Sequence, residues 1–306
     1  GVTVREELEA AVATLAAAGV DTARVDAEWL LADALGTPRL ALRLEGDRVL
    51  SGPIRGRYRA AIARRARREP LQRVLGWEEF RGLRFRVTPE VLVPRPETEM
   101  LVGSVLELLP EPAAGRRLRV VDVGTGSGCI AWAIARERPD ALVLALDVSL
   151  GAARVAVENA RGLGLRDRVG VAAGDLLEAI GDGAVDLIVA NPPYLPIGLL
   201  PGLAPEVRAP APRLALDGGP DGLAVIRRLI AGARRPLAPG GTLILESAGG
   251  EQAAAVRALL RQAGFVEIAT RRDLAGIDRF VVGVRAAGRS TAEASGEMIE
   301  DRRGAA

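Results

Sequence analysis

The amino-acid sequence predicts an α/β fold: a mainly parallel β-sheet covered by helices, with a small helical region before it. Two features lead to this prediction. After Arg119, short apolar segments alternate with segments of helical pattern, and a glycine-rich turn joins the first apolar segment to the helix that follows. Parallel strands are joined by crossover helices that cover the sheet, so this alternation is typical of layered α/β proteins.

Residues 1–72 are expected to form an N-terminal helical domain. The apolar spacing predicts helical segments at 4–17, 22–35, 40–44 and 52–68. Asp21 or Thr22 can cap the second helix, and Gly36 with Pro38 ends it.

Residues 73–95 are expected to form a β-hairpin linker. Apolar and polar side chains alternate in the second half of 77–87, and Arg81-Gly82 lies at its middle. Two short strands around a turn that contains glycine are typical of a hairpin.

Residues 96–286 are expected to form the sheet and its helices. Strands are predicted at 120–123, 141–146, 169–172, 185–190, 242–245, 265–269 and 280–284. Helices are predicted from Pro96 or Glu97 and at 129–138, 150–163, 223–237 and 251–263. The last two strands are expected to close the sheet as a hairpin with an antiparallel last strand. The tail, 287–306, is polar and rich in small residues, which predicts disorder.

The composition excludes several classes of function. The 306 residues are 49% hydrophobic, enough for a sizeable core and two domains. They contain no histidine, so Ser-His-Asp catalysis and histidine metal ligands are excluded. One cysteine, Cys129, forms no disulfide framework and disfavours a zinc site, so no metal is expected. We find no apolar run of membrane-spanning length and no signal-peptide pattern, and expect a cytoplasmic protein without a membrane partner.

The charge is almost balanced overall but is uneven along the chain. There are 41 basic residues, all arginine, and 39 acidic ones. Residues 55–86 contain 11 arginines and three acids, Glu69, Glu78 and Glu79. This segment could meet an acidic or nucleic-acid-associated partner, or it could be a solvated helix face.

A glycine-rich turn, Asp122 to Cys129 ("DVGTGSGC"), follows the first strand of the sheet. Its glycines let backbone amides approach a ligand at the positive end of a helix. The spacing is G-x-G-x-G, whereas a dinucleotide fingerprint requires a glycine where this chain has Cys129. Taken alone, the turn could equally be a tight connection from strand to helix.

Two further motifs follow neighbouring strands. Asp147 ends the second strand, where a carboxylate beside the glycine turn can bind ribose hydroxyls. "NPPY", residues 191–194, follows the fourth strand, and its two prolines stiffen the chain and exclude it from the sheet. The carboxyl ends of parallel strands meet at one edge of a sheet, so these motifs are expected to converge on one crevice.

These motifs together resemble class I S-adenosylmethionine-dependent methyltransferases that act on a planar amide or amine nitrogen, including adenine-N6 DNA and protein glutamine-N5 methyltransferases. Residues 69–102 ("EPLQRVLGWEEFRGLRFRVTPEVLVPRPETEMLV") and 273–282 ("DLAGIDRFVV") are similar to the bacterial release factor glutamine methyltransferases of the PrmC/HemK family. The resemblance covers the chain to about Arg285 and implies the Rossmann-like class I methyltransferase sheet.

The resemblance also implies a site. S-adenosyl-L-methionine would bind at this site, give up its methyl group and be released as S-adenosyl-L-homocysteine. Its methionine moiety would lie on the glycine turn, its ribose on Asp147, and its adenine near Asp175 and Leu176. The residues implied for the cofactor are Gly124, Thr125, Gly126, Ser127, Gly128, Asp147, Asp175, Leu176 and Asn191. Those implied for substrate binding are Asn191, Pro192, Pro193 and Tyr194, of which Asn191, Pro192 and Tyr194 are the catalytic candidates and Tyr194 packs against the amide.

The substrate implied is the glutamine of the Gly-Gly-Gln motif in class I peptide chain release factors, methylated on its side-chain N5 by a monomer that needs no nucleic acid. The alternatives are N5-glutamine methylation of a ribosomal protein, adenine-N6 methylation of DNA, and a cofactor-binding module without catalysis. One departure from the family is Ala211, which precedes Pro212 where a glutamate is usual.

Overall fold

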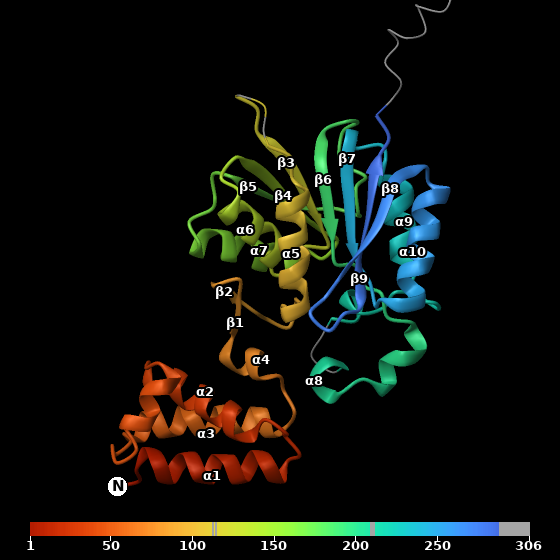
Figure 1. The fold of residues 1–306 in the computed structure, drawn as a ribbon. Coiled ribbons are helices and arrows are strands. Elements are labelled where there is room, and N and C mark those ends of the chain that lie inside the picture. Colours follow the sequence, from red (N-terminus) through yellow and green to blue (C-terminus); the bar gives the residue numbers. More distant parts are fainter. Residues whose placement is uncertain (112, 114, 209–211, 288–306) are drawn as a thin grey trace, which may run out of the picture.

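A seven-stranded sheet forms the larger part of the protein, and a group of helices forms the smaller part (Figure 1). The computed structural model describes residues 1–111, 113, 115–208 and 212–287. The tail expected to be disordered and the family departure at Ala211 therefore lie outside the described residues, apart from position 287.

The smaller part contains the helices predicted from the sequence and one more. Its elements are α1 (Val4–Ala17), α2 (Ala23–Leu35), η1 (Arg39–Leu44), α3 (Gly52–Ala66) and α4 (Leu71–Leu75). Thr3 and Glu6 form a reciprocal capping box at the start of α1. Tyr58 is fully buried between helices and donates a hydrogen bond to the carbonyl of Ala27 over 3.1 Å. The unpredicted helix, α4, has only five residues, too few for a periodic pattern.

A hairpin connects the two parts, as predicted. Its strands are β1 (Trp77–Phe80) and β2 (Leu83–Arg86). Arg81 and Gly82 both have positive φ, 48° and 72°, which suits a two-residue turn between antiparallel strands. The Trp77 ring meets the Trp29 ring of α2 edge to face, 5.9 Å between centroids, so the hairpin packs against the helical part.

The sheet has the order β5-β4-β3-β6-β7-β9-β8, in which only β9 runs against the others. Its strands are β3 (Leu118–Val123), β4 (Ala141–Asp147), β5 (Val169–Ala173), β6 (Val185–Ala190), β7 (Leu237–Glu246), β8 (Phe265–Arg272) and β9 (Asp278–Arg285). The predicted fold class is therefore confirmed, including the antiparallel last strand. The strand order reverses on either side of β3, which places a crevice at its carboxyl end.

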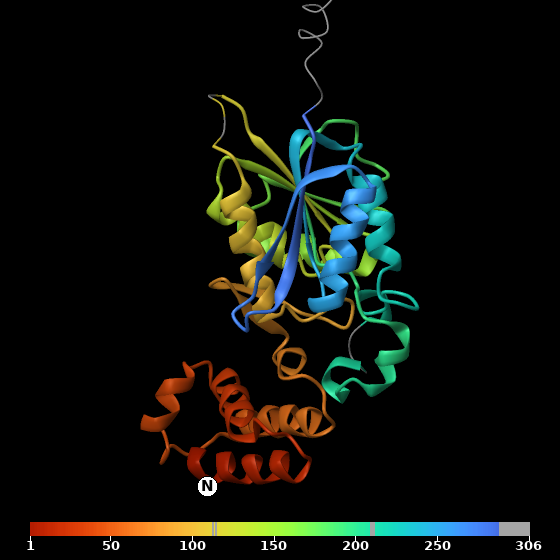
Figure 2. The ribbon, with the colours of Figure 1, turned by 45° about the vertical axis from the view of Figure 1, so that its right-hand side comes forward.

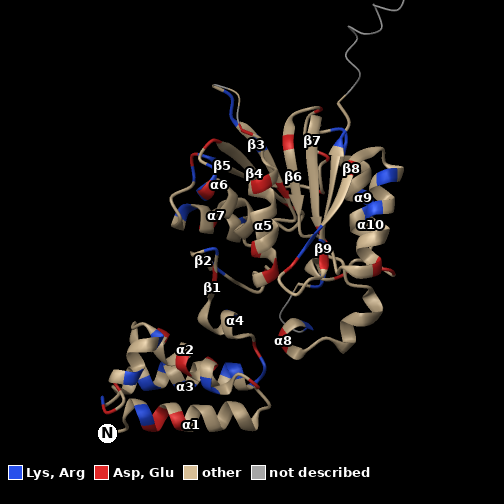
Figure 3. Cartoon of the chain, in the orientation of Figure 1, with Lys and Arg blue, Asp and Glu red and all other residues tan. Residues whose placement is uncertain are grey.

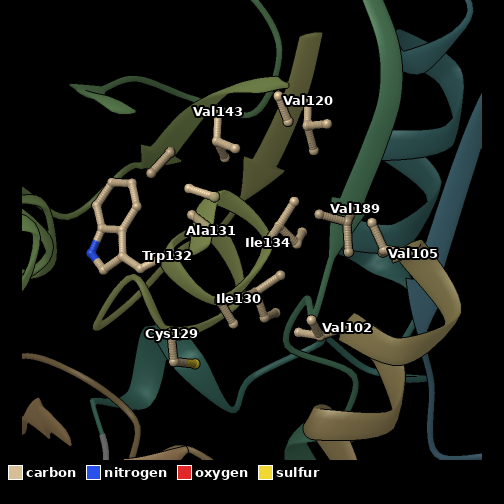
Figure 4. Packing of buried hydrophobic residues seen from close by; sticks show 14 of the residues in the cluster. Val102, Val105, Val120, Cys129, Ile130, Ala131, Trp132, Ile134, Val143 and Val189 are labelled. Atoms are coloured by element: carbon tan, nitrogen blue, oxygen red, sulfur yellow. The ribbon is translucent and has the colours of Figure 1, made fainter. Parts of the chain in front are cut away.

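Helices cover both faces of the sheet (Figures 1 and 2). One face carries α5 (Pro96–Leu108), α6 (Cys129–Glu137) and α7 (Leu150–Gly162), and the other carries α9 (Ala224–Ala233) and α10 (Gly250–Gln262). Val120 belongs to the first core and its neighbour Val121 to the second, because successive strand residues face opposite sides. Figure 4 shows the first core, to which α6 contributes Trp132 and Ile134 and the sheet contributes Val143 and Val189.

Short helical turns lie between β6 and α9: η2 (Ile197–Gly202), α8 (Pro205–Arg208) and η3 (Arg213–Ala215). The largest difference from the sequence-based boundaries is nearby, since α9 ends at Ala233 and β7 begins at Leu237. Pro236 explains this difference, because a proline disfavours helical backbone in the residue before it. Among the described residues, no helix combines the length and apolar character needed to cross a membrane.

Candidate functional site

A pocket of about 470 Å³ lies at the carboxyl ends of β3, β4 and β6. Its walls come from segments that are far apart in the sequence: the glycine turn, the ends of two strands, the segment before α5, and the region between β6 and α9. Its lining includes Glu90 to Arg95, Thr98, Val123 to Ser127, Cys129, Leu146 to Ser149, Gly174 to Leu176, Asn191 to Pro193, Pro212 to Ala215 and Arg228. The predicted motifs thus converge as the sheet topology requires.

The glycine turn forms one wall. Gly124, Gly126 and Gly128 have φ of 73°, 56° and 84°, a backbone region that other residues rarely adopt. No atom would meet a Cβ at Gly124 or Gly126, so both leave open space beside the backbone. Gly128 does not line the pocket; a Cβ there would collide with the indole of Trp132, so this glycine serves packing.

Asp147 holds the turn in place as well as facing the pocket. Its Oδ2 accepts a hydrogen bond from the Gly126 amide over 2.9 Å, and its Oδ1 accepts one from the Ser149 amide over 2.9 Å. Burial raises the pKa of Asp147, while the two amides act in the opposite direction. The carboxylate oxygens keep lone pairs that can accept hydroxyl groups from a ligand.

Asp122 lies behind the turn, fully buried. Its Oδ2 accepts a hydrogen bond from Thr125 Oγ1 over 2.6 Å, and its Oδ1 has no hydrogen-bond partner in the described part of the chain. Burial raises its pKa to about 7, and nearby Asp147 adds to this effect. Sequence analysis did not single out Asp122 as a site residue.

The NPPY motif divides between the pocket and the core. Asn191, Pro192 and Pro193 line the pocket. Tyr194 packs against the second core and is not part of the lining, although it was predicted to pack on the substrate. Burial, followed by the charge of Glu246, raises the pKa of the Tyr194 hydroxyl to about 12. The tyrosine therefore remains a neutral hydrogen-bond donor.

Glu246 and Thr98 connect the two ends of this motif. Thr98 Oγ1 donates to Glu246 Oε2 over 2.9 Å, and the Tyr194 hydroxyl lies 3.4 Å from Glu246 Oε1. Asn191 Nδ2 in turn donates to Thr98 Oγ1 over 3.3 Å. Thr98 and Glu246 are each only 2% exposed, so the centre of this network is shielded from water.

Asp175 and Leu176 also line the pocket. The Asp175 carboxylate is paired with Arg228 of α9 over 2.7 Å. Leu176 has a positive φ of 51°, which is uncommon for a residue other than glycine.

Sequence reasoning missed Thr98, Asp122, Glu246 and Arg228. For Glu246 a signal was present, because a charged residue directly follows the apolar run Leu243-Ile244-Leu245, as Asp147 follows its strand. For Thr98 and Arg228 there was no such signal, since each is only one of the polar residues of its helix.

Most arginines of the arginine-rich stretch form ion pairs within the protein. Figure 3 shows basic and acidic positions mixed over the helical part. The acids that pair with the arginines of the stretch are Glu7, Asp26, Glu69, Glu137, Glu158 and Glu206. Most of these acids lie outside 55–86. Counting arginines and acids within the stretch alone therefore overstated the charge that is left unpaired. Arg57 and Arg67 are exposed and pair with no carboxylate among the residues that the structure describes.

Comparisons with known proteins agree with this architecture. The family model described as PrmC N-terminal domain matches residues 6–76, and the one described as Methyltransferase small domain matches 99–196. A release factor glutamine methyltransferase from Geobacter sulfurreducens is 45% identical over 92% of this chain and 96% of its own length. Another with that description, from Moorella thermoacetica, is 47% identical over 92% and 99%.

Solved structures are similar in fold at low sequence identity. The catalytic domain of hMettl16, in complex with the MAT2A 3′UTR hairpin 1, is 18% identical, with a TM-score of 0.55 over 81% of this chain and 85% of that one. The human methyltransferase 10 domain containing protein is also 18% identical, with a TM-score of 0.51 over 75% and 97%.

Proposed function

The chain belongs to the release factor glutamine methyltransferase family, and we propose on that basis that it methylates the glutamine of the Gly-Gly-Gln motif in class I peptide chain release factors, on the side-chain N5. The observation that carries this proposal is the convergence of Asn191, Pro192 and Pro193 with the glycine turn and Asp147 on one pocket. S-adenosyl-L-methionine is the proposed methyl donor and S-adenosyl-L-homocysteine the product.

The residues of the pocket fit this cofactor. Gly124 and Gly126 leave the open space that a close-lying methionine moiety needs, and Asp147 offers carboxylate oxygens to ribose hydroxyls. Leu176 can cover an adenine ring, with Asp175 beside it. When bound, S-adenosyl-L-methionine supplies a methyl group made electrophilic by its sulfonium.

The chain's own task is to orient a poor nucleophile. The lone pair of an amide nitrogen is delocalised, so the substrate NH2 must be held by acceptors that direct the lone pair toward the methyl group. The side-chain oxygen of Asn191 and the carbonyl of Pro192 are suitable acceptors, and the two prolines hold them rigidly. Positioning and electrostatics supply the rate enhancement.

The helical part is proposed to bind the body of the release factor. We propose domains at 1–72 and 96–286 with the hairpin linker at 73–95; the separate buried cluster around Leu15, Leu31 and Tyr58 supports this division. Arg57 and Arg67 are two exposed basic groups of the helical part that are available to an acidic partner. Reversing their charge should weaken release factor binding and leave cofactor affinity unchanged, with Arg136→Glu, on exposed α6 surface, as the control. Equal loss of cofactor affinity would argue against this division of labour.

The test is mass spectrometry of a purified release factor after incubation with the protein and S-adenosyl-L-methionine. One added methyl on the Gly-Gly-Gln glutamine, absent with Asn191→Ala, is expected. Calorimetry with S-adenosyl-L-homocysteine should show that Asn191→Ala still binds cofactor, and a release factor with alanine for that glutamine is the substrate control. If the protein binds the cofactor but adds no methyl to the release factor, a ribosomal protein or DNA becomes the proposed substrate. If it binds the cofactor and transfers a methyl to none of these substrates, a non-catalytic module is favoured. We also propose that the protein acts as a monomer in the cytoplasm.

A further inference from the structure

We propose that Glu246 is a positioning residue that sets the direction of the hydrogen bonds leading to Asn191, so that the amide oxygen of Asn191 faces the pocket. This inference rests on the proposed function, because it explains how the acceptor for the substrate NH2 is presented. Glu246 itself does not line the pocket and acts through Thr98 and Tyr194.

The argument begins with burial. Glu246 ends β7 at 2% exposure, beneath the NPPY segment and beside the first turn of α5. A carboxylate out of contact with water must satisfy its oxygens with protein donors. The Thr98 hydroxyl donates a hydrogen bond to Oε2 over 2.9 Å, and the Tyr194 hydroxyl lies 3.4 Å from Oε1.

The direction of the chain of bonds follows from what each group can do. An ionised carboxylate only accepts hydrogen bonds, so the single hydroxyl proton of Thr98 is committed to Glu246. Thr98 Oγ1 can then only accept from its other neighbour, and it accepts from Asn191 Nδ2 over 3.3 Å. With its NH2 group held on this side, the amide of Asn191 presents its oxygen in the other direction. A substrate NH2 needs that oxygen, because it is itself a donor.

Tyr194 holds the other end of the motif to the same carboxylate. Its backbone carbonyl also accepts from Gln252 Nε2 over 2.8 Å, so the segment after the two prolines is fixed on both sides. Glu246 therefore ties together two residues of the motif that point in different directions, Asn191 toward the pocket and Tyr194 toward the core.

The ionisation of Glu246 should control the direction of the hydrogen bonds that run through Thr98 to Asn191. Burial raises its pKa to about 7, and the hydrogen bond from Thr98 acts in the opposite direction. The charged groups that face it are Arg279 of β9, which favours the carboxylate, and Glu97 of α5, which disfavours it; Tyr194 stays neutral. A protonated Glu246 could donate a hydrogen bond, and the constraint on Thr98 would be lost.

The test is steady-state methyl transfer to a release factor, measured from pH 6 to 9 for wild type and variants. Glu246→Gln keeps the shape but can donate as well as accept, and kcat should fall roughly tenfold to a hundredfold, as for a misaligned reactant. KM for the release factor and the affinity for S-adenosyl-L-homocysteine should stay unchanged. In wild type, kcat should rise near pH 7 as Glu246 becomes ionised. This rise should vanish in Glu246→Gln and persist in Asp122→Asn, which removes the other carboxylate of similar pKa.

Matched variants separate positioning from general damage. Thr98→Val removes the hydroxyl at constant shape and should reproduce the loss, whereas Thr98→Ser keeps the hydroxyl and should lose much less. Glu107→Gln, an exposed carboxylate on the same helix as Thr98, should leave kcat unchanged. A Glu246→Gln enzyme with wild-type kcat and pH profile, or a Thr98→Ser enzyme as slow as Thr98→Val, would overturn the inference. Failure of the wild type to methylate the release factor would instead overturn the proposed function.

Discussion

Arg68, just beyond α3 of the helical part, binds Glu206 of α8, 138 residues later in the chain, through its Nε at 2.5 Å. Arg65 also reaches this carboxylate over 3.2 Å and is itself paired with buried Asp26. Glu206 belongs to the segment between the NPPY motif and α9, part of which lines the pocket. The Glu206 carboxylate thus joins the helical part to the segment that supplies part of the pocket wall.

Glu206→Gln should loosen this segment. Hydrogen bonds to charged groups contribute about 1.5–3 kcal/mol, so the open form of the segment should become at least roughly tenfold more populated. Trypsin cleavage after Arg208 under native conditions measures this, with Glu158→Gln, whose ion pair lies on the exposed α7 surface, as the control. Equal cleavage rates in wild type and Glu206→Gln would show that the contact does not restrain the segment.

Acid should break the same contact. Burial alone would raise the pKa of Glu206, but hydrogen bonds from Arg68 and Arg65 bring it down to about 2. Its unfolded pKa is near 4.5, so its contribution to stability is complete above that pH and disappears as the pH falls toward 2. Wild type should therefore become more sensitive to pepsin, which is active in acid, as the pH falls below 4, and Glu206→Gln should show a smaller change.

Gly128→Ala should destabilise the fold more than Gly126→Ala. Both positions have positive φ, which costs an alanine about 1–2 kcal/mol. Only at Gly128 does the added methyl also collide with buried Trp132, so about 1–3 kcal/mol of overpacking is added. Urea unfolding followed by circular dichroism measures the difference, and equal midpoints for the two variants would contradict the packing role of Gly128.

Asp147→Asn should weaken cofactor binding about tenfold or more. An asparagine can accept from only one of the amides of Gly126 and Ser149, and its NH2 would face the other amide N–H. Calorimetry with S-adenosyl-L-homocysteine gives the affinity. Asp140→Asn, at the opposite end of β4 and paired with Arg138, is the control and should bind normally. An unaltered affinity for Asp147→Asn would remove Asp147 from the proposed cofactor site.

Asp122 should make the protein less stable as the pH rises. Its folded pKa is about 7 and its unfolded value about 3.8, so between these values the folded state retains a proton that the unfolded state has lost. The free energy of unfolding should fall by at least about 1 kcal/mol from pH 5 to 8, since one pKa unit corresponds to about 1.4 kcal/mol. Asp122→Asn should flatten this decline, leaving the smaller part due to Glu246. A wild-type stability that rises over this range would contradict the buried, protonated state.

The sequence predicted those features that depend on local pattern. Alternating apolar strands and helices, with glycines at one turn, were sufficient to place Asn191 and Asp147 at the same edge of the sheet. The contacts that complete the site depend on tertiary structure: Thr98 meets Glu246 across 148 positions, and Arg68 meets Glu206 across 138. No periodicity encodes such pairs. For the same reason the sequence could not decide whether the arginines of 55–86 meet an acidic partner or form a solvated face, because the acids that pair with most of them are distant in the chain.

The packing of Trp77 on Trp29 has a practical consequence for following the protein in solution. Arg84 stacks on the outer face of Trp77 at 3.7 Å and Arg39 lies 5.3 Å from Trp29, so these two indoles lie where the hairpin meets the helical part. The third indole, Trp132, is fully enclosed in the sheet core. Intrinsic fluorescence should therefore report two separate events: an emission shift from the first pair when the parts come apart, and another from Trp132 when the sheet unfolds.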